Sequence, residues 1–231
     1  MNLLPLYVIA NCRLIRIRYR YSCQPRYADD TQLYVSARQH DARDVEERLT
    51  GCMENIAQWM ASNRPKLNPA KTDFMWCATR RRQHQLNKDH VTFAGSAIRP
   101  SSTVRDLGVM LDSKLSFGPH ISQLVSQCFL QLRRIKSCVQ VLSMDVRKTV
   151  VNSFVISRVD YCNSLLARVP RYQLDRLQSV MNTAARLIVG AKKQDHIKHV
   201  LKDCLHWLPI PQRVQFKLCL LTYKALHGLA P

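Results

Sequence analysis

Acidic residues are scarce in this chain of 231 residues. It holds 16 Asp and Glu against 35 Lys and Arg, which gives a formal net charge of +19. Residues 1–28 contain no Asp or Glu, and residues 119–231 hold 17 basic side chains against five acidic ones. Such an excess of positive charge favours polyanionic partners, above all nucleic acid. A ribosome-like or aggregation-prone basic chain is the less specific alternative.

The chain also lacks paired cysteines and long apolar runs. None of its nine cysteines has a CxxC partner, so neither a zinc ribbon nor a thioredoxin-like site is predicted. Scattered single cysteines are typical of buried thiols in a reducing compartment. The apolar run LLPLYVIA, residues 3–10, contains a proline, is too short for a membrane span and lacks the basic segment of a signal peptide. We therefore expect an intracellular protein, in the nucleus or the cytoplasm, without membrane association.

The first part of the chain carries strand patterns around a pair of carboxylates. Residues 11–26 alternate apolar and basic side chains, which is typical of a strand with two different faces. In RYADDTQLYV, residues 26–35, strand-forming residues flank Asp29 and Asp30. Because Asp-Asp favours a turn, this segment predicts a tight β-hairpin with both carboxylates at its tip.

A helix and further strands are predicted before residue 118. Apolar residues at steps of three and four indicate a helix over residues 45–60, which should end before Asn63. A strand is predicted over residues 74–78, and short strands within residues 91–112, with a turn at Gly95-Ser96.

From Gly118-Pro119 onward the pattern changes to helices. A fourth helix is predicted over residues 195–206, and a fifth from Pro211, a favourable first helical position. The predicted fold class is therefore α+β, with a boundary near residue 118. The apolar stripes of the first three helices consist of Ile121, Leu124, Val125, Cys128, Leu132, Ile135, Val139 and Leu142, then of Val150, Phe154 and Val155, and then of Leu174, Leu177, Met181, Ala184, Ala185 and Ile188.

Six segments in order along the chain carry a resemblance to a known family. Together they resemble the C-terminal part of the reverse transcriptase of non-LTR (LINE-type, jockey-like) retrotransposons, over nearly the whole chain from residue 27. A YADD tetrapeptide alone is a weak signal, whereas six ordered blocks are a strong one. The blocks are YADDTQLYV, LNPAKTDFMWCA, VRDLGVMLDSKLSF, FVISRVDYCNSLL, LDRLQSVMNTAARLI and CLHWLPIPQRVQFKLCLLTYKALHGLAP.

The resemblance implies a role for several residues. Asp29 and Asp30 match the catalytic palm carboxylates, which would hold Mg²⁺ or Mn²⁺, and Lys71 matches a lysine near the incoming triphosphate. The implied partners are an RNA template and a DNA primer. The implied domains are a partial palm over residues 1–118, a thumb-like helical bundle over residues 119–190 and a helical extension over residues 191–231.

Catalysis by this chain alone is not expected. A two-metal site of this type needs a further carboxylate from a strand before YADD, and residues 1–28 contain none. Asp41 and Asp44 follow the hairpin and are interpreted as charges at a helix N-terminus. The fingers and the upstream palm strand are missing, and both ends of the chain look truncated. We expect a fragment of an RNA-directed DNA polymerase; the alternatives are a non-catalytic nucleic-acid-binding remnant and a decayed transposon reading frame.

Two basic clusters are candidates for nucleic-acid binding. Arg80, Arg81 and Arg82 form either a phosphate-contacting loop or a solvated turn. Arg133, Arg134 and Lys136 lie on a helix whose other face is apolar, and as thumb residues they would meet the backbone of a duplex.

Two other groups of residues are expected to be structural. A histidine and cysteine cluster matches no common zinc-ligand spacing, and lysines interleave with it, so a polar helix face is expected there. Its members are His196, His199, Cys204 and His206. The three tryptophans lie within apolar patterns and are predicted to be core residues; they are Trp59, Trp76 and Trp207.

Overall fold

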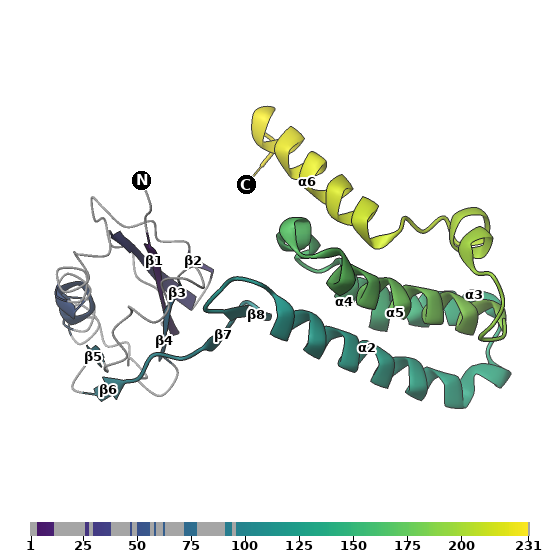
Figure 1. Cartoon of the computed structure of the whole chain (residues 1–231), viewed down its shortest axis with the longest axis horizontal. Coiled ribbons are helices and arrows are strands. Elements are labelled where there is room, and N and C mark those ends of the chain that lie inside the picture. Colours follow the sequence, from purple (N-terminus) through teal and green to yellow (C-terminus); the bar gives the residue numbers. More distant parts are fainter. Residues whose placement is uncertain are drawn as a thin grey trace. The chain divides into compact units, whose positions relative to one another are not determined.

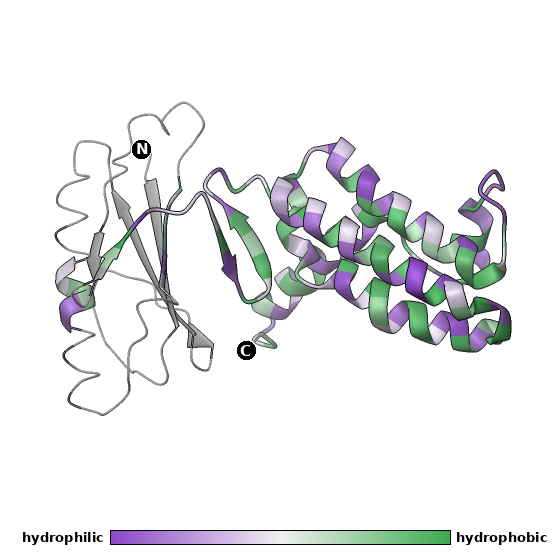
Figure 2. Cartoon of the chain, turned by 90° about the horizontal axis from the view of Figure 1, so that it is seen from below, coloured by the Kyte–Doolittle hydropathy of each residue, from purple (hydrophilic) through white to green (hydrophobic). Residues whose placement is uncertain are grey.

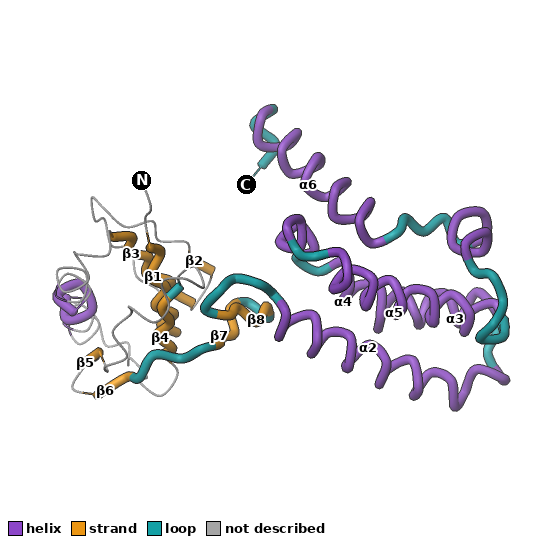
Figure 3. The backbone as a smooth tube through the Cα atoms, in the orientation of Figure 1, coloured by secondary structure: helices purple, strands orange, loops and turns teal. Residues whose placement is uncertain are grey.

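The computed structural model has an α+β fold, as predicted. It describes residues 4–11, 26–27, 30–37, 47, 50–55, 58, 62, 72–77, 91–93 and 96–230. The chain divides into two compact units, Met1–Ser116 and Phe117–Pro231. The described strands lie in the first unit, and the long helices form the second (Figures 1 and 3).

A four-stranded antiparallel sheet organises the first unit. Its strands are β1 (Leu4–Asn11), β2 (Arg26–Tyr27), β3 (Asp30–Ala37) and β4 (Thr72–Trp76), in the order β2-β3-β1-β4. The apolar run near the start of the chain is thus an inner strand, which the sequence analysis did not predict. Val, Ile, Leu and Tyr make it a good strand former. The predicted strand over residues 11–26 lies outside the described residues apart from Asn11 and Arg26.

The position of Pro5 in this inner strand has a simple explanation. Proline cannot donate a hydrogen bond to a neighbouring strand, so it is rarely found in the middle of a sheet. Here β1 pairs with β4 only over Leu6–Ala10, and Pro5 is paired on the β3 side alone, with Ser36. The proline therefore lies at a position where β1 has β3 as a neighbour but no partner residue in β4.

Two short hairpins follow the sheet, as predicted for residues 91–112. The strand β5 (Val91–Phe93) pairs with β6 (Ser96–Ile98), and β7 (Thr103–Asp106) pairs with β8 (Val109–Asp112). The second hairpin turns through Leu107 and Gly108, with φ of 42° and 86°. Positive φ at both central residues is the geometry that matches the twist of a two-residue hairpin, and glycine adopts it without strain.

The predicted strand over residues 74–78 and the predicted helix over residues 45–60 are both present. The strand is β4, which lies two residues earlier than expected and contributes the buried Phe74, Met75 and Trp76. The described residues of the helix run from Glu47 to Ser62, and among them Met53 is buried.

The second unit is a helical bundle with one hydrophobic core. Figure 2 shows hydrophobic and hydrophilic stripes along its helices, as expected for amphipathic segments. Its helices are α2 (Gly118–Cys138), α3 (Met144–Val151), α4 (Ser157–Asp160), α5 (Arg171–Val189) and α6 (Ile210–Leu226). Shorter 3₁₀ and π segments are Val139–Val141, Asn152–Ile156, Asn163–Arg168 and Val200–Cys204.

The stripes of α2 and α5 agree with the sequence analysis. Ile121, Leu124, Cys128, Leu132 and Ile135 of α2 are buried, and so is every predicted core residue of α5. The other predicted members of the first stripe are half-buried, and two of them lie beyond the end of α2 at Cys138; they are Val125, Val139 and Leu142. Pro119 stands in the first turn of α2 and Pro211 in the first turn of α6, where a missing backbone N–H costs nothing.

Two details of the helical prediction were wrong. Phe154, counted in the second stripe, is 51% exposed, because the wide π turn over Asn152–Ile156 shifts the inward face to Val155, Ile156 and Val159. The fourth helix does not begin at Asp195. Asp195 instead closes the preceding turn, where its Oδ2 accepts a hydrogen bond from the backbone N–H of Lys192 at 2.7 Å.

The expectation of buried thiols was correct for only part of the cysteines. Cys77 and Cys128 are buried, but Cys138, Cys204 and Cys219 are exposed. The exposed ones stand on the outer faces or ends of helices, where apolar neighbours in the sequence do not by themselves ensure burial.

Candidate nucleic-acid interface

The YADD segment forms the predicted hairpin. Strand pairing joins Tyr27 to Asp30 and Arg26 to Thr31. Asp30 is the first residue of β3, and Ala28 and Asp29 lie outside the described residues. The placement of both carboxylates at a metal site stays a prediction.

The register of the sheet identifies what lies beside Asp30. Asp30 is paired with Asn11, the last residue of β1. The next strand, β4, begins at Thr72, which is paired with Ala10. The sheet therefore brings the start of β3, the end of β1 and the start of β4 to one end.

The other residues predicted for this site are not described by the structure. Lys71 immediately precedes Thr72 in the sequence, and Arg80, Arg81 and Arg82 follow β4. These four residues lie outside the described part of the chain. Their roles stay predictions from the resemblance.

Arg133, Arg134 and Lys136 are described, and they lie on the outer face of α2. All three side chains are exposed, whereas Leu132 and Ile135 between them are buried against the core. Within the described residues, the three cations form no ion pair with an acidic side chain. The apolar periodicity of α2 thus directs an unneutralised basic face to solvent.

Ion pairing neutralises little of the charge on the helical unit. Within residues 117–230, which are described throughout, the two ion pairs are Arg171–Asp175 at 3.0 Å and Arg213–Asp160 at 2.6 Å. The first is a solvated pair one helical turn apart. Most of the 17 basic side chains of this unit therefore remain available to an external polyanion.

The histidine and cysteine cluster after α5 lies at the surface. His196, His199, Cys204 and His206 are all exposed. In the part of the chain that the structure describes, no three His, Cys, Asp or Glu side chains gather so that they could hold a metal ion. Trp76 and Trp207 are buried, as predicted for core residues, and Trp59 lies outside the described residues.

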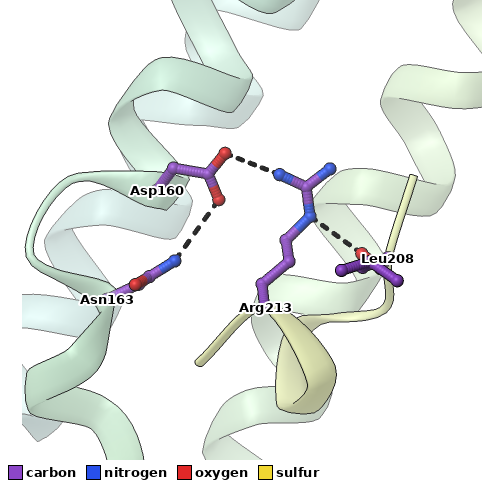
Figure 4. A network of polar contacts seen from close by, with 4 residues as sticks. All are labelled: Asp160, Asn163, Leu208 and Arg213. Carbon is purple, nitrogen blue, oxygen red and sulfur yellow. Dashed lines mark hydrogen bonds and ion pairs between the residues drawn. The ribbon is translucent and has the colours of Figure 1, made fainter. Parts of the chain in front are cut away.

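A partly buried polar network that sequence reasoning missed attaches α6 to the bundle (Figure 4). The guanidinium of Arg213 donates from Nη1 to Asp160 Oδ2 at 2.6 Å and from Nε to the carbonyl of Leu208 at 2.8 Å. Asn163 Nδ2 donates to the other oxygen of Asp160 at 3.4 Å. Asp160 and Arg213 lie 53 residues apart, and nothing in a single sequence pairs them.

A cleft of about 310 Å³ adjoins this network, and His206, Phe216 and Lys217 are among the residues that line it. His206 has φ of 54°, and Cys162 at the turn before Asn163 has φ of 52°. Both are non-glycine residues in the left-handed region, which is uncommon for residues with a side chain.

None of the described helices is long and apolar enough to cross a membrane. This finding concerns the described residues, which include all of α2 to α6.

Comparison with known proteins agrees with the resemblance at a coarse level. No protein-family model matches the chain, and no solved structure matches it. A probable RNA-directed DNA polymerase from transposon BS of Drosophila melanogaster is 26% identical over 167 residues. The match covers 70% of this chain but only 18% of that relative. The similarity supports a relationship between this chain and transposon reverse transcriptases.

Proposed function

We propose that this chain is the palm-to-thumb portion of a non-LTR, LINE-type retrotransposon reverse transcriptase, and that its helical unit binds the phosphate backbone of an RNA–DNA duplex. The similarity to a transposon polymerase supports the origin. The observation that carries the binding role is the exposed basic face of α2 at Arg133, Arg134 and Lys136, which no acidic side chain of the described residues neutralises.

Backbone binding follows from the chemistry of this face. Lysine and arginine contacts to phosphate release condensed counterions, so they give affinity without sequence preference. Since the three cations lie on a rigid helix with a buried opposite face, they keep a fixed spacing and lose little freedom on binding.

The residues beside Asp30 do not fit a complete metal site. The resemblance assigns Mg²⁺ or Mn²⁺ to Asp29 and Asp30, but β1 supplies Asn11 in register with Asp30 and carries no acid. Asp73 of β4 lies two strands away from β3, a separation of roughly 10 Å. Asp73 pairs with Ile9, so it is also two residues out of register with Asn11, the partner of Asp30. Nucleotide transfer by this chain alone is therefore not expected.

A duplex-binding assay tests the proposal. The full chain should bind a 20-base-pair RNA–DNA hybrid in fluorescence anisotropy, with an affinity that falls steeply as salt rises. The triple variant Arg133→Gln, Arg134→Gln, Lys136→Gln should bind more weakly at every sequence, and its salt slope should fall by about 0.9 for each lost phosphate contact, two to three in all.

The matched control removes the same charge elsewhere on the unit. Arg168, Lys217 and Lys224 are exposed, and replacing these three by Gln should change the slope far less. Circular dichroism would verify that both variants keep their helices. Equal slopes for the two triple variants would contradict the role of α2.

A further inference from the structure

The chain topology gathers several segments at one end of the helical bundle. Both α2 and α5 finish there and α3 begins there (Figure 1). Arg147 of α3 joins them, because its Nη1 donates to the carbonyl of Ile188 in α5 at 3.4 Å and its Nε donates to that of Leu142 at 2.9 Å. We call residues 133–148 and 186–204 the basic end.

The basic end concentrates positive charge. It contains ten Lys and Arg against three acids, Asp145, Asp195 and Asp203. Seven of the ten are exposed and form no ion pair with any described residue. These seven are Arg133, Arg134, Lys136, Lys192, Lys193, Lys198 and Lys202.

The loop after α5 presents two of these lysines from an ordered turn. Gly190, with φ of 72°, ends α5, and the backbone N–H of Ala191 donates to the carbonyl of Arg186 at 3.0 Å. The backbone N–H of Lys192 donates to Asp195 Oδ2 at 2.7 Å, and the backbone N–H of Asp195 donates to the carbonyl of Lys192 at 3.2 Å. Arg186 Nη2 donates to the carbonyl of Asp195 at 3.2 Å. Lys192 and Lys193 thus extend from a fixed backbone.

The following segment adds two lysines of like charge. Lys198 and Lys202 are four residues apart and both exposed, while Ile197, Val200 and Leu201 anchor the segment in the core. Like charges at this spacing repel each other when no partner is bound. An external polyanion would relieve the repulsion.

Helix-dipole compensation does not account for this charge. Lys136 and Arg186 stand in the last turns of α2 and α5, where a cation is favourable. Lys192 and Lys193 lie beyond α5 in the turn, and the dipole effect is confined to the last turn of a helix. Lys202 stands in the last turn of the Val200–Cys204 segment, where a cation is again favourable. Lys192, Lys193 and Lys198 therefore need another explanation.

We propose that Lys192, Lys193, Lys198 and Lys202 form a second phosphate-backbone contact, which extends the α2 face into one nucleic-acid-binding surface at the basic end. The proposal rests on the duplex binding proposed above. The partner chemistry is a run of phosphodiester anions, because cations spread over two helices and a loop match a repeating charge better than a single anion.

The test compares two double variants of the full chain. Lys192→Gln with Lys193→Gln removes two cations from the loop, and Lys217→Gln with Lys224→Gln removes two exposed cations from α6. Against the 20-base-pair RNA–DNA hybrid, the loop variant should weaken binding roughly tenfold at low salt and lower the salt slope by about two. The α6 variant should stay near wild type.

Three other results would overturn the proposal. If the two double variants bind the duplex with equal affinity and equal salt slope, while the α2 triple variant binds more weakly, the α2 face binds the duplex and the loop does not. Absence of duplex binding by the wild-type chain would refute both proposals. Loss of binding to phosphatidylserine vesicles in the loop variant, with duplex affinity unchanged, would assign these lysines to anionic lipid instead.

Discussion

Two cysteines of this chain, Cys77 and Cys128, show how burial raises the pKa of a thiol. Desolvation raises the pKa of the Cys128 thiol to about 11, although Arg158 acts in the opposite direction. Burial, and then the nearby Asp112 carboxylate, raise the pKa of Cys77 to about 12. Asp112 is itself held by backbone N–H groups of Lys114 and Ser116 at 3.0 and 3.2 Å. Both thiols are therefore protonated and unreactive at neutral pH.

Cys128 should make the stability of the helical unit depend on alkaline pH. Its pKa is raised in the folded state above the ordinary value of 9.0, so its contribution is complete below pH 9 and is lost as the pH rises toward 11. Urea unfolding followed by helical circular dichroism from pH 8 to pH 11 should show a steeper decline for wild type than for Cys128→Ala. Parallel declines in the two proteins would contradict this expectation.

At the scale of elements, the attachment of α6 depends on a long-range polar contact as much as on its apolar face. Ile210 and Val214 are the buried residues of α6, and Phe216, Leu221, Tyr223 and Leu226 are exposed. With so small an apolar contact, the Arg213–Asp160 pair and the bond from Arg213 to Leu208 fix the start of the helix. Arg213 also lies 6.0 Å from the centre of the Trp207 ring, within reach of a cation–π interaction.

Replacing Asp160 by Asn should destabilise the helical unit by about 1–2 kcal/mol, because the guanidinium of Arg213 is only 14% exposed and would lose its charged partner. Asp175→Asn is the matched control: its pair with Arg171 is exposed on both sides and contributes roughly 0.5 kcal/mol or less. Urea unfolding of both variants gives the comparison. A loss at Asp160 no larger than that at Asp175 would show that α6 is held by packing alone.

The whole molecule combines a strand unit that carries the predicted metal ligands with a helical unit that carries most of the excess charge. The short hairpins and the amphipathic helices α2 and α5 follow the sequence pattern closely. The acidic pair at Asp29 and Asp30 stands in a chain whose first 28 residues contain no acid, and the strand paired with Asp30 ends in Asn11. Within the described sheet, β1 thus supplies no acid in register with Asp30.

A primer-extension assay tests whether this chain can synthesise DNA. In a working polymerase, Asp29→Asn removes a metal ligand and should slow nucleotide addition roughly a thousandfold or more. For this chain of 231 residues we expect no template-directed extension with Mg²⁺ or Mn²⁺, and none with Asp29→Asn. An active reverse transcriptase on the same template serves as the positive control. Extension by wild type that is lost in Asp29→Asn would mean that another acid completes the site.

The sequence alone determined the local features of this protein. Alternation of apolar and polar residues predicted the strands after residue 74. Apolar residues at steps of three and four predicted the stripes of α2 and α5. Both patterns arise because burial of one face of an element imposes that spacing. The motif blocks indicated the relationship to reverse transcriptases. The exposure of Arg133, Arg134 and Lys136 also followed from the stripe, since residues between buried positions on a surface helix face solvent.

Only the tertiary structure decided the features that depend on distant segments. It placed the apolar run of β1 inside the sheet and Asn11 opposite Asp30, and it joined Asp160 to Arg213. It also turned Phe154 outward through a π turn and brought the segment after α5 to the end of the bundle where α2 finishes. Local periodicity carries no information on which segments pair, because pairing is set by how the whole chain buries its apolar faces together.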